Sequence, residues 1–104
     1  MGHTYSQIIT HIIFSTQNRI PYLKPELRDR IFRYMAGVAH GIDASELLIN
    51  GVDDHVHVLM TIPPALSVGA AVNKIKANSS KWIHERRLLP RAFAWQTGGT
   101  AHSP

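Results

Sequence analysis

The chain has 104 residues, which is enough for one small domain and little else. Apolar residues make up 44% of the sequence and charged residues 17%, a composition that excludes an intrinsically disordered chain. Eleven Lys and Arg against seven Asp and Glu give a net charge of +4, which favours an anionic partner such as nucleic acid.

The composition and the apolar runs also exclude cysteine-based sites and a membrane-spanning segment. The chain has no cysteine, so disulfides, thiolate metal sites and a cysteine nucleophile are ruled out. No apolar run approaches the roughly 20 residues that a membrane span needs. Met1–Thr10 lacks the pattern of a signal peptide, so we expect a cytoplasmic protein with no membrane partner.

Hydrophobic patterning in the first half of the chain predicts a strand, a helix and a second strand. Ile8–Thr16 is rich in β-branched residues and is typical of a buried strand. After a polar loop, Pro25 suits the first turn of a helix with one apolar face, and Gly41 is its predicted end. Leu47–Val52 is predicted to be a strand, in which Gly51 indicates a bulge.

The second half predicts a strand, a helix and a last short strand. His55–Ile62 alternates with period two, and Ser67 is the expected N-cap of a helix that reaches about Glu85. Phe93–Gln96 is the predicted last strand and Gly98-Gly99 a turn. The order predicts an α+β, ferredoxin-like βαββαβ sandwich, with two helices on one face of an antiparallel sheet.

Two histidines in the alternating strand form a candidate metal site. His55 and His57 point to the same side, with Cβ atoms about 6–7 Å apart. Asp53 and Asp54 precede them and are candidates for a carboxylate ligand or for a hydrogen bond that orients a ligand. Two histidines do not complete a site, and an ordinary exposed pair is the alternative. His11 lies on the first strand, where we expect a core histidine rather than a third member of the group.

The second predicted helix carries a polar stripe suited to phosphate contacts. Lys74, Asn78 and Lys81 lie along it, Lys76 flanks it, and Arg19 in the first loop is a further candidate contact. A solvated helix face is the alternative. The arginines of the first helix alternate with an acidic residue and indicate an ordinary surface: Arg28, Arg30 and Arg33.

Several segments, in a fixed order, resemble one protein family. They are His11–Thr16, Asn50–Leu59, Ile62-Pro63-Pro64, Ser67-Val68, Ile75-Lys76, Ser79-Ser80-Lys81-Trp82, and Phe93-Ala94-Trp95-Gln96 with Gly98. Over nearly the whole chain they resemble the single-tyrosine HUH transposases of bacterial insertion sequences and their repeat-associated relatives.

The resemblance implies a homodimer that binds single-stranded hairpin DNA. It implies a divalent metal, Mg²⁺ or Mn²⁺, held by His55, His57 and a polar residue of a later helix, which polarises the scissile phosphate. It further implies a tyrosine on that helix that attacks phosphorus and forms a 5′-phosphotyrosine.

The sequence departs from the family at its end. The family's catalytic helix follows the Phe93–Gln96 segment, and this sequence stops at Pro104, so the catalytic tyrosine and the third metal ligand have no counterpart. Tyr5, Tyr22 and Tyr34 are poor substitutes.

The expectation is therefore a single HUH domain over residues 1–104 that lacks the C-terminal catalytic helix. This would be a truncated, transposase-type DNA-binding domain. The alternatives are a non-catalytic module that binds hairpin DNA and a ferredoxin-like RNA-binding protein. The RNA-binding alternative would be expected to expose aromatic rings on the third strand, and this strand has none.

Overall fold

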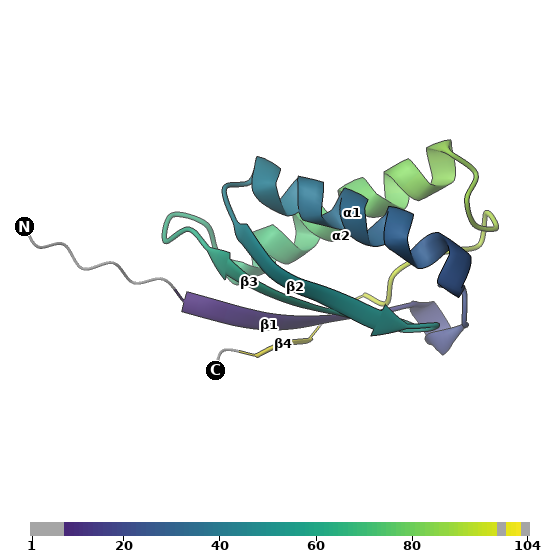
Figure 1. The fold of residues 1–104 in the computed structure, drawn as a ribbon, viewed down its shortest axis with the longest axis horizontal. Helices are drawn as coiled ribbons and strands as arrows, with labels where there is room; N and C mark the ends of the chain where they lie inside the picture. Colours follow the sequence, from purple (N-terminus) through teal and green to yellow (C-terminus); the bar gives the residue numbers. More distant parts are fainter. Residues whose placement is uncertain (1–7, 98–99, 103–104) are drawn as a thin grey trace, which may run out of the picture.

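Two helices cover one face of an antiparallel sheet in the computed structural model, which describes residues 8–97 and 100–102 (Figure 1). The elements in chain order are β1 (Ile8–Ser15), a turn of 3₁₀ helix η1 (Gln17–Arg19), α1 (Pro25–Gly41), β2 (Ser45–Val52), β3 (His55–Ile62), α2 (Val68–Glu85) and β4 (Thr100–His102). The strand order is β2-β3-β1-β4, and every neighbouring pair is antiparallel. This confirms the predicted βαββαβ arrangement.

Both helices begin and end where their capping residues predict. Pro25 occupies the first turn of α1, where its missing N–H costs no hydrogen bond, and α1 ends at Gly41. Ser67 precedes α2, and its side chain accepts a hydrogen bond from the Ala70 amide at 3.0 Å. Neither helix of the described ranges combines the length and the hydropathy needed to cross a membrane.

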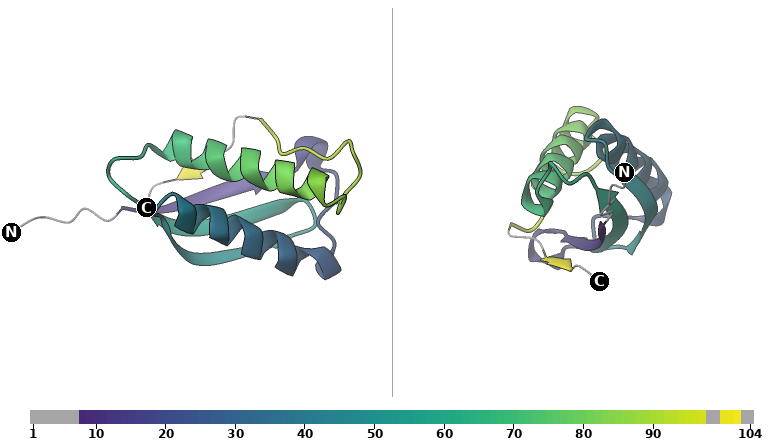
Figure 2. Two further views of the ribbon diagram at one scale, coloured as in Figure 1. Left: turned by 90° about the horizontal axis from the view of Figure 1, so that it is seen from above. Right: turned by 90° about the vertical axis from the view of Figure 1, so that its left-hand side faces the viewer.

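The hydrophobic core lies between the helices and one face of the sheet. Side chains of β1 and β3 that point toward the helices are fully buried, whereas their neighbours on the other face are half-buried or exposed. The inward set comprises Thr10, Ile12 and Phe14 of β1 with Val56, Val58, Met60 and Ile62 of β3. The end-on view of Figure 2 shows both helices on the same side of the strands. The other face is therefore open, and it carries the alternate side chains of β1 and β3.

The prediction of a last strand at Phe93–Gln96 is wrong. Trp95 forms only an isolated bridge with Thr16, and the fourth strand of the sheet is β4, which pairs with β1. The alternation that suggested a strand arises because Phe93 and Trp95 are both buried in the core. The turn predicted at Gly98-Gly99 falls outside the described residues.

The predicted bulge at Gly51 is also wrong. The register of β2 against β3 shifts between Glu46 and Leu48, and Gly51 lies in regular pairing with Val56. A Cβ atom at Gly51 would lie 2.5 Å from the carbonyl oxygen of His55. Glycine is needed here because the two backbones approach too closely for a side chain.

A buried hydrogen-bond chain links α2 to Trp95. The Trp95 indole donates to Ser79 Oγ at 3.0 Å, and this hydroxyl donates to the Ile75 carbonyl at 2.6 Å. We expect Ser79→Ala to lower the free energy of unfolding by about 1–3 kcal/mol, because it leaves the indole N–H buried without a partner. Urea denaturation measures the loss. Ser80→Ala is the control, and an equal loss in both variants would contradict the assignment.

Candidate metal centre

Three histidines from two adjacent strands meet on the open face of the sheet. His57 pairs with Ile13, and His11 lies two residues along β1, diagonally across from His57. His11 Nε2 is 2.9 Å from His57 Nδ1, and the two ring centroids are 5.0 Å apart. The expectation of a core histidine at position 11 is wrong, because its neighbour Ile12 takes the inward position.

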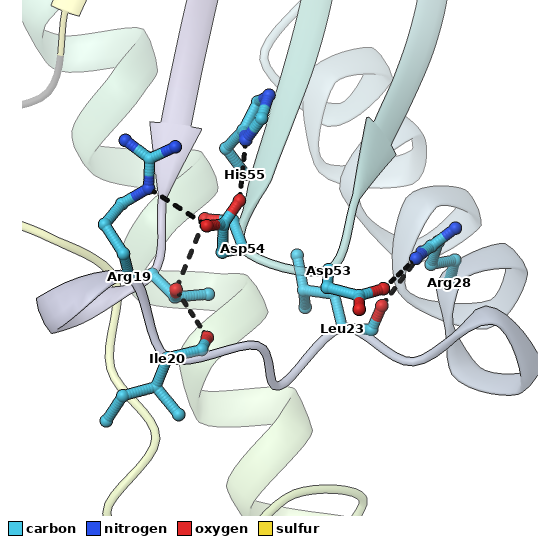
Figure 3. Close-up of polar contacts among 8 residues, drawn as sticks. Arg19, Ile20, Leu23, Arg28, Asp53, Asp54 and His55 are labelled. Carbon is cyan, nitrogen blue, oxygen red and sulfur yellow. Dashed lines mark hydrogen bonds and ion pairs between the residues drawn. The ribbon is translucent and has the colours of Figure 1, made fainter.

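The carboxylate of Asp54 fixes the ring of His55. Asp54 Oδ1 lies 2.8 Å from His55 Nδ1, and this hydrogen bond lowers the pKa of Asp54 against the opposing effect of its partial burial (Figure 3). A carboxylate only accepts hydrogen bonds, so His55 Nδ1 is the donor. In neutral His55 the lone pair is therefore on Nε2. The centroid of the His55 ring lies 5.0 Å from the centroid of the His57 ring.

A cation lies on the other side of the same carboxylate. Arg19, in η1, places its Nε 3.3 Å from Asp54 Oδ2 and further lowers the pKa of Asp54 (Figure 3). The Arg19 side chain is 61% exposed, so an anion in solvent can reach its guanidinium group. The structure thus brings one predicted nucleic-acid residue next to the histidines through Asp54.

The neighbouring aspartate has a different partner. Asp53 forms an ion pair with Arg28 of α1, whose Nε also donates to the Leu23 carbonyl at 2.8 Å (Figure 3). The side chain of Arg28 is only 25% exposed, so the expectation of an ordinary surface is wrong for this residue. Asp53 thus joins the loop before β3 to α1, and Asp54 is the aspartate that contacts the histidine pair.

His57 is in the protonation state that a metal ligand needs. The pKa of His57 is lowered, first by desolvation and then by the charges of His55 and His11, so its ring is neutral at neutral pH. A cavity of about 340 Å³ opens beside the three histidines and is lined by β2 residues as well. Within the described ranges, no three side chains among His, Cys, Asp and Glu are arranged to hold a metal. His55 and His57 supply two imidazoles, fewer than the protein ligands that a complete metal site needs.

The basic residues predicted on α2 do not lie with the histidines. Lys74, Asn78 and Lys81 are exposed on α2, which covers the opposite face of the sheet. The Asn78 amide donates to the Lys74 carbonyl at 2.8 Å, and Lys81 Nζ is 4.0 Å from Glu85. This part of the predicted interface is separated from the histidine pair by the thickness of the sheet.

Lys76 occupies a more enclosed place than the other lysines. Its Nζ donates to the Gln96 carbonyl at 2.5 Å, and burial lowers its pKa. It lines a cavity of about 470 Å³ between α2 and the segment 94–97, together with Ser80 and Trp95. Lys76 therefore ties this segment to α2 as well as presenting a cation.

The tyrosines of the described residues are remote from the open face. The Tyr22 ring meets Phe93 edge-on with centroids 5.3 Å apart. The Tyr34 ring stacks on Trp82 at 4.4 Å, between the two helices. Both rings pack on the helix side of the sheet, opposite the histidines, and Tyr5 lies outside the described residues.

Comparison with known proteins gives one family and one fold. The family model described as "Transposase IS200 like" matches residues 4–103. A crystal structure from Deinococcus radiodurans R1, assigned as a transposase, matches with a TM-score of 0.88 and 17% identity, over 100% of this chain and 83% of that one. A REP-associated tyrosine transposase bound to a REP hairpin matches with a TM-score of 0.69 and 14% identity. This chain is covered completely in that match but spans only 61% of that protein. None of the curated proteins matches in sequence.

Proposed function

This chain belongs to the IS200-like transposases. We propose that it acts as a transposase-type domain that binds single-stranded hairpin DNA. We also propose that it supplies two ligands to a metal ion. The hairpin is proposed because a similar structure was solved with a REP hairpin. One observation supports the proposal: contacts from Arg19 to Asp54 and from Asp54 to His55 place an exposed guanidinium cation beside the histidine pair. Because transposases act on DNA, a cytoplasmic location is part of the proposal.

The histidine pair is the proposed metal site. His55 and His57 would hold the ion through ring nitrogens, and Mn²⁺ suits imidazole ligands better than Mg²⁺, which prefers oxygen. When bound, the ion would polarise a scissile phosphate as a Lewis acid. Arg19 would bind a neighbouring phosphate group, and Asp54 would keep both His55 and Arg19 in place.

We propose binding, rather than strand cleavage, as the activity of this chain by itself. The covalent cleavage and rejoining that the family resemblance implies would use a tyrosine that reaches a phosphate at the histidine pair. Tyr22 and Tyr34 pack on the other side of the sheet. Cleavage would therefore need a tyrosine from outside the described residues or from a partner.

We expect the purified chain to bind a DNA hairpin more tightly than an unstructured strand of the same composition. Arg19→Ala should weaken binding and reduce the salt dependence, with a loss of about one in the slope of log K against log salt for each phosphate contact removed. Fluorescence anisotropy at several salt concentrations measures both. Arg33→Ala is the matched control, since Arg33 is an exposed cation paired with Asp29 on α1. Equal affinity for hairpin and unstructured strand would contradict the proposal.

A denaturing gel separates binding from cleavage. With Mn²⁺ present, we expect neither a nick in the labelled hairpin nor a covalent protein–DNA band. A Mn²⁺-dependent covalent band that disappears in His57→Ala would show that the chain is a working enzyme. That result would overturn the proposal of binding alone and keep the metal site.

We also propose that the chain is a homodimer. Ile9, Leu48 and Val52 expose large apolar side chains, and β2 is an unpaired edge of the sheet within the described residues. Size-exclusion chromatography with light scattering should give twice the chain mass of 11.6 kDa. A single peak at the mass of one chain would contradict the proposal.

A further inference from the structure

His57, like His55, is held through its Nδ1 atom, but its partner is another histidine. We propose that His11 is a positioning residue: its Nε2 accepts the hydrogen bond from His57 Nδ1–H and so keeps the lone pair of His57 on Nε2, where a metal ion can bind. The inference rests on the proposed function, because it assigns His11 a role toward the same metal site.

The argument begins with the number of protons on each ring. A neutral imidazole has one N–H and one lone pair, and the hydrogen bond at one nitrogen decides which nitrogen carries the proton. For His55 the partner is a carboxylate, and Nδ1–H follows directly. For His57 the partner is His11, whose Nε2 either donates or accepts.

Metal binding by His57 selects one of these two arrangements. Its Nδ1 faces His11 Nε2 at 2.9 Å, so Nε2 is the nitrogen left for an ion. Nε2 has a lone pair in the neutral ring only when the proton is on Nδ1, and His11 must then accept. Such an acceptor orients a ligating histidine and makes its free nitrogen more basic.

The sheet holds His11 in the position that this role requires. His11 and His57 lie on the central strands β1 and β3, in a register that runs without interruption from Ile8↔Ile62 to Ser15↔His55. Their rings are inclined by 28°, and both are half-buried. Two rigid strands, rather than a loop, therefore set the separation between the two rings.

The first test is the tautomer of His57 in the metal-free protein. Long-range ¹H–¹⁵N correlation spectra distinguish Nδ1–H from Nε2–H for each ring. We expect Nδ1–H at both His55 and His57 in the wild type. We expect His57 to lose this preference in His11→Leu and to recover it in His11→Gln, whose amide oxygen also accepts. A wild-type His57 with its proton on Nε2 would overturn the inference.

The second test is the affinity for Mn²⁺ alone, followed by electron paramagnetic resonance of the free ion. We expect His11→Leu to raise the dissociation constant by about 10- to 100-fold and His11→Gln to restore most of it. His40→Leu, at an exposed histidine near the end of α1, is the control and should bind as the wild type does. Unchanged affinity in His11→Leu, or no recovery in His11→Gln, would overturn the role of His11.

The two tests also separate this inference from the proposed function. A wild-type protein that binds no Mn²⁺ would overturn the proposed metal site. The tautomer measurement needs no metal, so it still decides whether His11 accepts from His57.

Discussion

Replacing His57 by alanine is expected to raise the dissociation constant for Mn²⁺ by more than about 100-fold. Losing a residue that only orients a metal ligand typically reduces metal affinity 10- to 100-fold, and removing one of the two proposed histidine ligands should reduce it more. Isothermal titration calorimetry of the metal-free protein measures the change. Folding should be little affected, because His57 is only half-buried on the open face.

His84 provides the matched control for this experiment. It lies in the last turn of α2, and its Nε2 contacts the Phe93 carbonyl at 3.0 Å on the side of the sheet away from the histidine pair. His84→Ala should leave Mn²⁺ affinity unchanged. If His57→Ala bound Mn²⁺ as tightly as the wild type, the histidine pair would not be the metal site.

The pH dependence of the proposed Mn²⁺ binding should follow from the pKa of His57. This pKa is lowered, so the ring keeps its lone pair to a lower pH than an ordinary histidine does. A proton competes with the ion only when the pH falls through that lowered pKa. We therefore expect the contribution of His57 to Mn²⁺ affinity to be constant from neutral pH down to that lowered pKa and to decline below it.

Periodicity in the sequence predicted which face each strand residue takes. The alternation in β3 correctly separated the buried valines from His55 and His57. The contact between His11 and His57 depends instead on the register between β1 and β3, which joins residues 46 positions apart. Strand periodicity does not determine register, so the contact between the two rings could not be predicted from the sequence.

The partners of the adjacent residues Asp53 and Asp54 could not be predicted from the sequence either. Asp53 and Asp54 were equivalent candidates beside the histidines, but the turn between β2 and β3 directs them to different partners. Asp53 pairs with Arg28 on α1, and Asp54 contacts His55 and Arg19. A turn of this kind has no hydrophobic periodicity from which side-chain directions could be predicted, so only the structure distinguishes the two roles.

At Gly51, one added methyl group should strongly destabilise the sheet beside the candidate site. A Cβ atom there would lie 2.5 Å from the His55 carbonyl oxygen, 3.0 Å from Val56 Cα and 3.2 Å from the Phe32 ring. Two of these three atoms belong to the backbone of β3, and Val56 is fully buried in the core. The added methyl group must therefore displace one strand from the other.

We expect Gly51→Ala to lower the free energy of unfolding by about 1–3 kcal/mol or more, since overpacking against a fixed backbone has costs of this size. Gly37→Ala is the matched control: Gly37 lies inside α1, where no atom other than those of its chain neighbours and of the helix's own nearby backbone lies within 4 Å of the added Cβ. That variant should be more stable by up to about 1 kcal/mol, because alanine favours the helix and restricts the unfolded chain. Urea denaturation of both variants measures the opposite shifts. A Gly51→Ala protein as stable as the wild type would show that β2 and β3 are not as close at His55 as the structure has them.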